Sequence, residues 1–254
     1  MDYSDIIKNQ FDRQARNFRD WSVTQNRDYM QAYFDFCLMD RSDTLLDVAC
    51  GSGEFVHFCA AGIDRAVGVD ISERMIDLAK HKAEVEKITN VEFICHDVQY
   101  LPCASEAFSV VTCKSAFHHV RAYDRVFSEM RRCCQTGGRV SIQDIVAYDQ
   151  EPVDEFFESL EQLIDISHHK TLAKSFYLDL YKRFDVTVKN TFELEIELHF
   201  RDYLRHAKQP EEDREQIEVL LQNGLSDSRT EKYFVVKDGE LYFKRNVFLI
   251  LGVK

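Results

Sequence analysis

The sequence has few of the features that mark special classes of protein. It contains three prolines in 254 residues and no apolar run near the roughly 20 residues that a membrane span requires. The first ten residues lack the basic and apolar regions of a secretion signal. A chain that is 45% hydrophobic and 30% charged is typical of a compact globule. We therefore expect a cytoplasmic protein without a membrane partner, as a monomer or a homodimer.

Metal-ligand patterns and basic tracts are scarce as well. Eight cysteines occur, but no pair has the Cys-x-x-Cys spacing, and only Cys133 and Cys134 are close in sequence. Because zinc sites need such spacing, we interpret the cysteines as reduced thiols and predict no bound metal. The formal net charge is −12, and the lysines and arginines are dispersed. Such a surface repels phosphate backbones, so we expect a small-molecule substrate and no nucleic acid partner.

Short apolar segments alternate with helical patterns between residues 44 and 144. Ser72 is placed to cap a helix that reaches Lys87, and Gly137-Gly138 is placed to end a helix near Cys133. Alternation of this kind predicts an α/β fold, a parallel sheet wrapped by helices. Five segments are almost continuously apolar, as strands covered on both faces must be: Thr44–Ala49, Ala66–Asp70, Val91–Cys95, Ser109–Cys113 and Arg139–Gln143.

The pattern changes after residue 144. Residues 153–164 keep one helix face apolar, and a second helix is predicted from about Leu172 to Arg183. No repeat or linker interrupts the chain, so we expect one domain, 1–254, with a helical lid at 1–40, a cofactor-binding core at 41–148 and a sheet edge and substrate cap at 149–254. The remaining segments are predicted as a strand, two helices and a closing hairpin: Asp185–Phe200, His199–Lys208, Pro210–Gly224 and Tyr233–Val253.

The stretch LLDVACGSGEF, residues 45–55, joins the first predicted strand to the next helix. Glycines there let the backbone approach a ligand, and parallel sheets bind ligands at the carboxyl ends of their strands. A dinucleotide fingerprint needs a third glycine at position 56, where this chain has Val56, and no G-x-x-x-x-G-K-[S/T] loop occurs. The turn at Gly51 and Gly53 therefore favours a ligand without a pyrophosphate.

Carboxylates follow the first three predicted strands. Asp70 ends the second strand, where it can accept hydrogen bonds from both ribose hydroxyls. Asp97 ends the third strand, where it can accept an adenine amino group, and Asp47 precedes the glycine turn, where it suits a cationic group. Any one of them can instead cap a helix or form a turn. The three in register with the glycine turn predict a pocket for an adenosine that carries a positive, phosphate-free tail.

Four motifs follow one another over residues 40–145: LLDVACGSGEF, GVDISERMIDLAK, VEFICHDVQYLPCASEAFSVVTCKSAFHHV and MRRCCQTGGRVSIQD. They resemble the class I S-adenosylmethionine-dependent methyltransferases, close to the ubiquinone and menaquinone biosynthesis group (methyltransferase type 11). FDRQARNF is similar to the amino-terminal segment that folds over the cofactor in that group. The resemblance implies a doubly wound, mostly parallel seven-stranded sheet of the Rossmann-like methyltransferase type. It also implies S-adenosyl-L-methionine as cofactor and S-adenosyl-L-homocysteine as product.

The resemblance further implies roles for particular residues. Lys114 and Ser115 would line the mouth where the substrate meets the methyl group. Ile71 and Met75 would flank the adenine, although both also suit a hydrophobic core. The implied cofactor-binding residues, from the methionine part through the ribose to the adenine, with Lys114 last, are Asp47, Ala49, Gly51, Gly53, Asp70, Ile71, Met75, Asp97, Val98 and Lys114.

His118 and His119 follow the fourth predicted strand and are the candidate catalytic residues. Either can act as a base on the substrate, or pack under the cofactor and orient a loop. Phe11, Phe18 and Trp21 can close over the sulfonium or belong to an ordinary core.

We therefore expect an enzyme that transfers a methyl group to oxygen, carbon or nitrogen of a small molecule. A non-catalytic S-adenosylmethionine-binding protein on the same fold is an alternative. An NAD(P)-dependent oxidoreductase is another, which Val56 disfavours.

Overall fold

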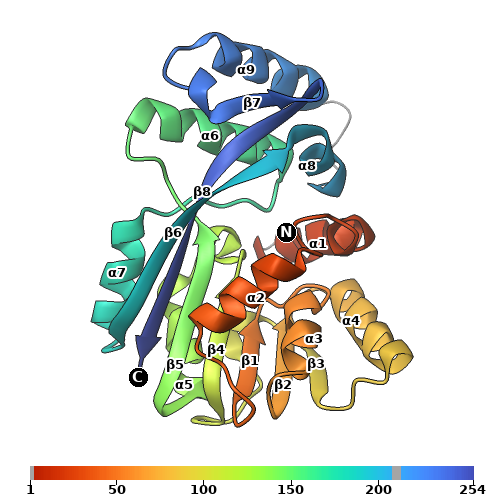
Figure 1. Ribbon diagram of the computed structural model, residues 1–254, viewed down its shortest axis with the longest axis vertical. Coiled ribbons are helices and arrows are strands. Elements are labelled where there is room, and N and C mark those ends of the chain that lie inside the picture. Colours follow the sequence, from red (N-terminus) through yellow and green to blue (C-terminus); the bar gives the residue numbers. More distant parts are fainter. Residues whose placement is uncertain (1–2, 208–212) are drawn as a thin grey trace.

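The computed structural model describes residues 3–207 and 213–254. A single sheet runs through it in the strand order β3-β2-β1-β4-β5-β8-β6, and β7 pairs with β8 beside this path (Figure 1). Strands β1 to β5 are parallel to their neighbours, whereas β8 runs antiparallel to β5, β6 and β7. The predicted mostly parallel seven-stranded sheet is thus confirmed, with β7 as an eighth strand. The strands are β1 Thr44–Val48, β2 Arg65–Asp70, β3 Val91–Cys95, β4 Phe108–Lys114, β5 Cys134–Ile145, β6 Thr187–His199, β7 Phe234–Lys237 and β8 Glu240–Val253.

Helices cover both faces of the sheet, as its nearly continuous apolar strands require. On one face, Met30, Val56 and Ile76 pack from α2, α3 and α4 into a buried cluster with the strands. On the other face, Phe127 and Tyr177 do the same from α5 and α7. The bounds of these helices are α2 Arg27–Phe36, α3 Glu54–Ala60, α4 Glu73–Glu86, α5 Tyr123–Cys133 and α7 Lys174–Arg183.

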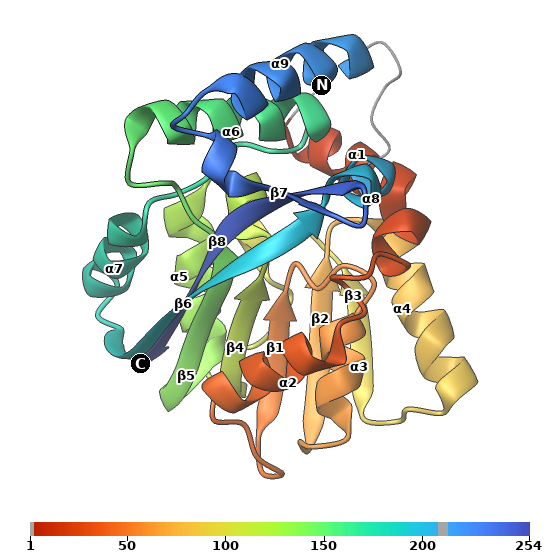
Figure 2. The ribbon, with the colours of Figure 1, turned by 45° about the horizontal axis from the view of Figure 1, so that its top comes forward.

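A cap lies beyond the carboxyl ends of the parallel strands, where β6 and β8 extend past the core (Figures 1 and 2). It has its own buried cluster, in which Phe157, Ile217 and Phe243 meet. Helix α1 lies between cap and core, and its Gln10 and Asn17 side-chain amides donate hydrogen bonds of 2.8 Å to carbonyls of α8. Within the described ranges, no helix is long and apolar enough to cross a membrane. The bounds of α1 and of the cap helices are α1 Tyr3–Arg19, α6 Glu151–Ile164, α8 Phe200–Ala207 and α9 Arg214–Ser226.

Two details of the sequence prediction are corrected. Gly137-Gly138 does not cap α5, because the chain passes directly from Cys133 into β5, and Gly137 takes its left-handed φ of 77° inside that strand. Helix α9 continues two residues past Gly224, to Ser226. Its predicted start at Pro210 lies outside the described residues.

Gly53 provides a test of the turn that opens α3. Its φ is 77°, and a β-carbon there would lie 2.6 Å from a ring carbon of Phe93. Gly53→Ala should therefore lower the free energy of unfolding by about 2–4 kcal/mol, from left-handed strain and overpacking together. Gly137→Ala is the matched control: it has the same φ with nothing within 4 Å, and should cost only about 1 kcal/mol. Equal losses in urea unfolding would contradict this packing.

Candidate active site

A cavity of about 380 Å³ lies at the carboxyl ends of the parallel strands, under α1. Its volume is in the range of small-molecule sites. It forms there because the loops after β1, β2, β3 and β4 diverge around the ends of strands that are themselves fully packed. Nine of the twelve predicted site residues line it: Asp47, Ala49, Gly51, Asp70, Ile71, Asp97, Val98, Lys114 and His119.

The other three predicted residues lie outside the cavity lining. Gly53 is the N-cap of α3, and its role is in the turn itself. Met75 is completely buried in α4. The ring of His118 is turned to Asp144 on β5. These three residues therefore lie next to the cavity without lining it.

Two residues of the cavity lining have a strained backbone conformation. Ala49 and Ser115, which follow the neighbouring strands β1 and β4, have φ values of 58° and 52°, although neither is a glycine. Residues with side chains rarely adopt this conformation, and it persists only where surrounding contacts enforce it. Gly51 has φ 55°, and its N–H donates to Asp70 Oδ2 at 2.8 Å. The loop after β1 is thus held in a shape that presents backbone groups to the cavity.

The carboxylates at the strand ends are strongly buried. Burial raises the pKa of Asp70 to about 6, against hydrogen bonds from the amides of Ser72 and Gly51. Burial also raises the pKa of Asp47 to about 7, partly offset by the Thr112 hydroxyl, which donates at 2.6 Å. Both carboxyls thus titrate near neutral pH, and a ligand that hydrogen-bonds to them or carries positive charge stabilises their ionised forms.

Asp97 forms the helix cap that the sequence left open as an alternative, and its role toward an adenine stays a prediction. Its Oδ1 accepts the amide of Gln99 at 2.9 Å and so caps the short 3₁₀ helix Val98–Tyr100, while the residue also lines the cavity. Lys114 also lines the cavity. Burial lowers the pKa of its ammonium group, and the carboxylates of Asp47 and Asp144 work in the opposite direction.

One face of helix α1 covers the cavity. Ser4, Ile7, Phe11 and Phe18, spaced three, four and seven residues apart, all line it. A β-carbon on Gly51 would lie 3.4 Å from Phe18 Cε1, so the Phe18 ring rests on the glycine turn.

Trp21, the third aromatic residue of the predicted lid, has a different place. It stacks on His206 of α8, with ring centroids 4.0 Å apart and an interplanar angle of 3°. It belongs to the contact between lid and cap rather than to the lining.

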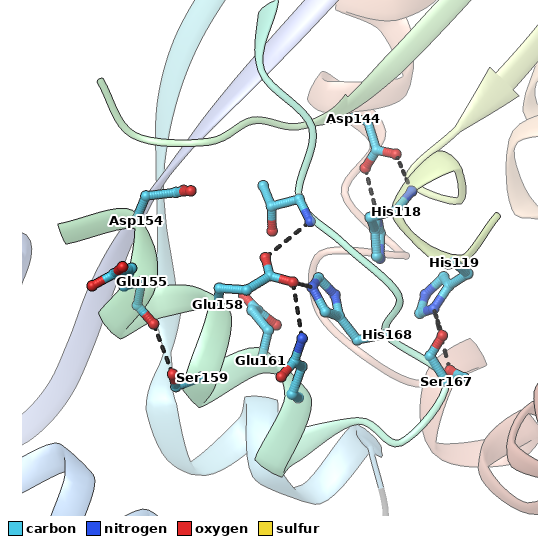
Figure 3. Close-up of polar contacts among 12 residues, drawn as sticks. His118, His119, Asp144, Asp154, Glu155, Glu158, Ser159, Glu161, Ser167 and His168 are labelled. Carbon is cyan, nitrogen blue, oxygen red and sulfur yellow. Dashed lines mark hydrogen bonds and ion pairs between the residues drawn. The ribbon is translucent and has the colours of Figure 1, made fainter. Parts of the chain in front are cut away.

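The two candidate catalytic histidines have different environments (Figure 3). They lie in the 3₁₀ helix η2, Phe117–His119, after β4. The His118 amide donates to Asp144 Oδ2 at 2.9 Å, and its Nδ1 lies 2.6 Å from Asp144 Oδ1. Burial opposes charge on the ring, but attraction to Asp144 and the hydrogen bond outweigh it and raise the pKa of His118. Asp144 thus anchors η2 through both groups of His118.

His119 faces the other way and lines the cavity. Its Nδ1 lies 3.0 Å from the carbonyl oxygen of Ser167, on the loop after α6, and 3.2 Å from the Ser167 hydroxyl. Burial, with His118 close by, lowers the pKa of His119 to about 3, so the ring is neutral at physiological pH. Ser167 and Asp165 were missed by the sequence analysis, because no local pattern in that loop marks them.

No group of three or more histidine, cysteine or acidic residues in the described part of the chain could hold a metal ion. All eight cysteines are free thiols. Cys50, inside the glycine turn, is held there with its thiol pKa raised well above the usual value, mainly by burial. The cavity thus combines buried carboxylates, a lysine and a histidine in its lining.

Comparison with known proteins agrees with this geometry. Residues 39–184 match the family described as "Methyltransferase domain". The uncharacterized methyltransferase YcgJ of Bacillus subtilis is 22% identical over 247 residues, which cover 96% of this chain and 97% of that protein. A demethylmenaquinone methyltransferase of Bacteroides fragilis is 26% identical over 53% of this chain and 56% of its own length.

Solved structures show the same fold. The crystal structure of YcgJ aligns with a TM-score of 0.82 and 19% identity, covering 90% of this chain and 99% of that one. Geranyl diphosphate C-methyltransferase of Streptomyces coelicolor, determined with S-adenosylhomocysteine, aligns with a TM-score of 0.62 and 17% identity over 89% of this chain and 76% of its own. The chain belongs to the methyltransferase domain family, and it is a class I S-adenosylmethionine-dependent methyltransferase. Neither alternative, the oxidoreductase or the non-catalytic protein, receives support from these relatives.

The anchor at Asp144 can be tested through its pH dependence. The pKa of His118 is raised in the folded protein. The His118–Asp144 pair therefore stabilises the fold fully at pH values below the unfolded-state pKa of about 6.5, and this stabilisation is lost as the pH rises through the folded-state pKa. Asp144→Asn should therefore cost about 3 kcal/mol of unfolding free energy at pH 6 and about 1 kcal/mol at pH 9. Urea unfolding at both pH values measures this, with Asp77→Asn, at an exposed position of α4, as control. An equal cost at the two pH values would refute the ion pair.

Proposed function

We propose that this enzyme methylates a small molecule at oxygen, carbon or nitrogen, with S-adenosylmethionine bound in the cavity under α1. The observation that carries the proposal is the convergence of the Gly51 turn, Asp70 and Asp97 on one cavity of about 380 Å³. The donor, when bound, supplies a methyl group on a positively charged sulfur. The acidic lining suits that charge, since buried carboxylates stabilise a cation.

The residues present fit the parts of this cofactor. Asp97, Ile71 and Val98 line one end, and we assign them to the adenine. Asp70 accepts amide hydrogens with both oxygens and keeps free lone pairs for two ribose hydroxyls. The pKa of Asp47 is about 7 in the free protein. The cofactor's ammonium group would stabilise its ionised form, directly or through water.

We assign the acceptor side to Lys114 at the end of β4 and to Ser115 and His119, which follow that strand. Helix α1 covers the cavity, which supports a small molecule and disfavours a polymer as the acceptor. The net charge of −12 supports the same choice against nucleic acid. Free thiols throughout the chain favour a reducing compartment, the cytoplasm.

A labelled methyl group tests the proposal directly. The purified chain is incubated with deuterium-methyl S-adenosylmethionine and a small-molecule extract, and labelled products are sought by mass spectrometry. We expect one or a few labelled metabolites that disappear with Asp70→Ala and persist with Asp77→Asn, an exposed carboxylate of α4. Products that form equally in Asp70→Ala would overturn the assigned site.

Binding of S-adenosylhomocysteine should depend on pH through Asp70. The ionised carboxylate accepts the ribose hydroxyls, and its pKa of about 6 in the free protein must fall on binding. The affinity should therefore be highest above pH 7 and fall by up to about tenfold per pH unit below pH 6. Asp70→Asn should weaken binding roughly 100-fold at pH 8 and remove that share of the pH dependence. Calorimetry at several pH values measures both, and a variant with wild-type affinity would contradict the ribose assignment.

A further inference from the structure

The environment of His119 specifies which of its nitrogens carries a proton. A carbonyl oxygen only accepts hydrogen bonds, so Nδ1, 3.0 Å from the Ser167 carbonyl, must be the protonated nitrogen. In a neutral imidazole this leaves Nε2 without a proton. Ser167 does not line the cavity whereas His119 does, so the ring turns its Nδ1 edge away from the cavity and its other edge toward it.

Asp165 makes this arrangement stronger. Its Oδ1 accepts both the amide of Ser167, at 2.8 Å, and the Ser167 hydroxyl, at 2.5 Å. Because the hydroxyl donates to Asp165, its lone pairs face His119 Nδ1 at 3.2 Å as acceptors. In the hydrogen-bonded series His119, Ser167, Asp165, each side-chain donor therefore points away from the cavity. Burial opposes charge on Asp165, yet attraction to His119 and these hydrogen bonds lower its pKa.

The groups that face His119 come from several elements. His118 lies beside it on η2, with ring centroids 4.0 Å apart, and Asp144 of β5 neutralises His118 from behind. From α1, the Phe11 ring lies edge-on at 5.0 Å, and the Tyr3 hydroxyl donates to the His119 carbonyl at 3.1 Å.

Two further histidines lie near this cluster. The ring of His168 is 6.5 Å from that of His119 and bonds to Glu158 at 3.1 Å. His206 of α8 is attracted to Asp165, although burial lowers its own pKa to about 4. Asp165 is therefore the carboxylate that stabilises positive charge on His119 through Ser167.

We propose that Asp165 and Ser167 are positioning residues that hold His119 as a general base, and that the methyl acceptor carries a proton on the atom to be methylated, as in a hydroxyl group. The inference rests on the proposed function and specifies its substrate class. The acceptor's proton passes to His119 Nε2, and the acceptor's electron pair forms the bond to the methyl carbon. The pair of the broken carbon–sulfur bond stays on sulfur, which leaves as a neutral thioether.

A base of low pKa is adequate for this step. The proton of the acceptor becomes strongly acidic only as the new bond forms, so it needs a nearby acceptor at that moment rather than a strong base beforehand. The imidazolium is stabilised by Asp165 and returns its proton to water when the product leaves. The ring of His118 bonds to Asp144, and His118 does not line the cavity. His118 therefore holds η2 in place and does not take the proton.

The first test measures the tautomer of His119 and needs no methyl acceptor. In the full chain with ¹⁵N-labelled histidine and bound S-adenosylhomocysteine, long-range ¹H–¹⁵N spectra should show His119 as the neutral Nδ1–H tautomer, assigned by its loss in His119→Gln. Asp165→Ala removes the oxygen that accepts the Ser167 hydroxyl, so this hydroxyl can turn and donate to Nδ1 in competition with the Ser167 carbonyl, and the tautomer balance should shift toward Nε2–H. An Nε2–H tautomer in the wild type, or no shift in Asp165→Ala, would overturn the proposal. Failure of the proposed function has a different signature, because S-adenosylhomocysteine would then not bind in calorimetry.

The second test uses kinetics with the acceptor that the labelled methyl group identifies. His119→Ala should lower kcat by 10²–10⁴-fold with the affinity for S-adenosylhomocysteine unchanged, and added imidazole should restore part of the rate. Ser167→Ala should lower kcat about tenfold, and Ser167→Thr, which keeps the hydroxyl, should recover it. His81→Gln, exposed on α4, is the control. An acceptor without a dissociable proton, methylated equally by wild type and His119→Ala, would overturn the substrate class.

Discussion

The site depends on one buried carboxylate that joins two loops. Asp70, at the end of β2, accepts the amide of Gly51 from the loop after β1 and the amide of Ser72 at the start of α4, both at 2.8 Å. These bonds hold the glycine turn against the end of β2, next to strained Ala49. Without them the turn would relax toward ordinary backbone angles, and the cavity wall would lose its shape. The carboxylate assigned to the ribose therefore also builds the pocket.

A second set of contacts ties the later part of the chain to this core. The carbonyl of His118 accepts amides of His169 and Lys170, while the Tyr3 hydroxyl donates to the Ser167 carbonyl. Three segments distant in sequence thus meet at η2: the lid, the end of β4 and the loop after α6. The core strands, the lid and the cap are consequently joined at η2. The cap therefore contacts the cavity lining through His119 and through helix α1, whose Phe18 packs near His206 of α8.

Most of the core was predictable from the sequence, and the reason is physical. Strands buried on both faces must be apolar throughout, and parallel strands bring their carboxyl ends to one edge. Asp47, Asp70 and Asp97 could therefore be placed at one pocket before any coordinates were known. Met75 could not be assigned, since a buried apolar residue on a helix suits a ligand pocket and a core equally.

The acceptor side could not be predicted to the same depth. Which of His118 and His119 faces the cavity depends on partners 26 and 48 residues away, at Asp144 and Ser167. Neither pairing leaves a periodic pattern in the sequence. The same holds for Asp165, which lies on a loop, and for the glycines at 137 and 138, which form an irregular strand where a helix cap was expected.

The central claim is that a cofactor occupies the cavity under α1 with its ribose on Asp70. A crystal structure of the chain with S-adenosylhomocysteine measures this most directly. The account predicts ribose hydroxyls within hydrogen-bonding distance of both Asp70 oxygens, adenine beside Asp97, and the sulfur on the same side of the cavity as His119. A ligand bound elsewhere, or bound with its ribose away from Asp70, would contradict it.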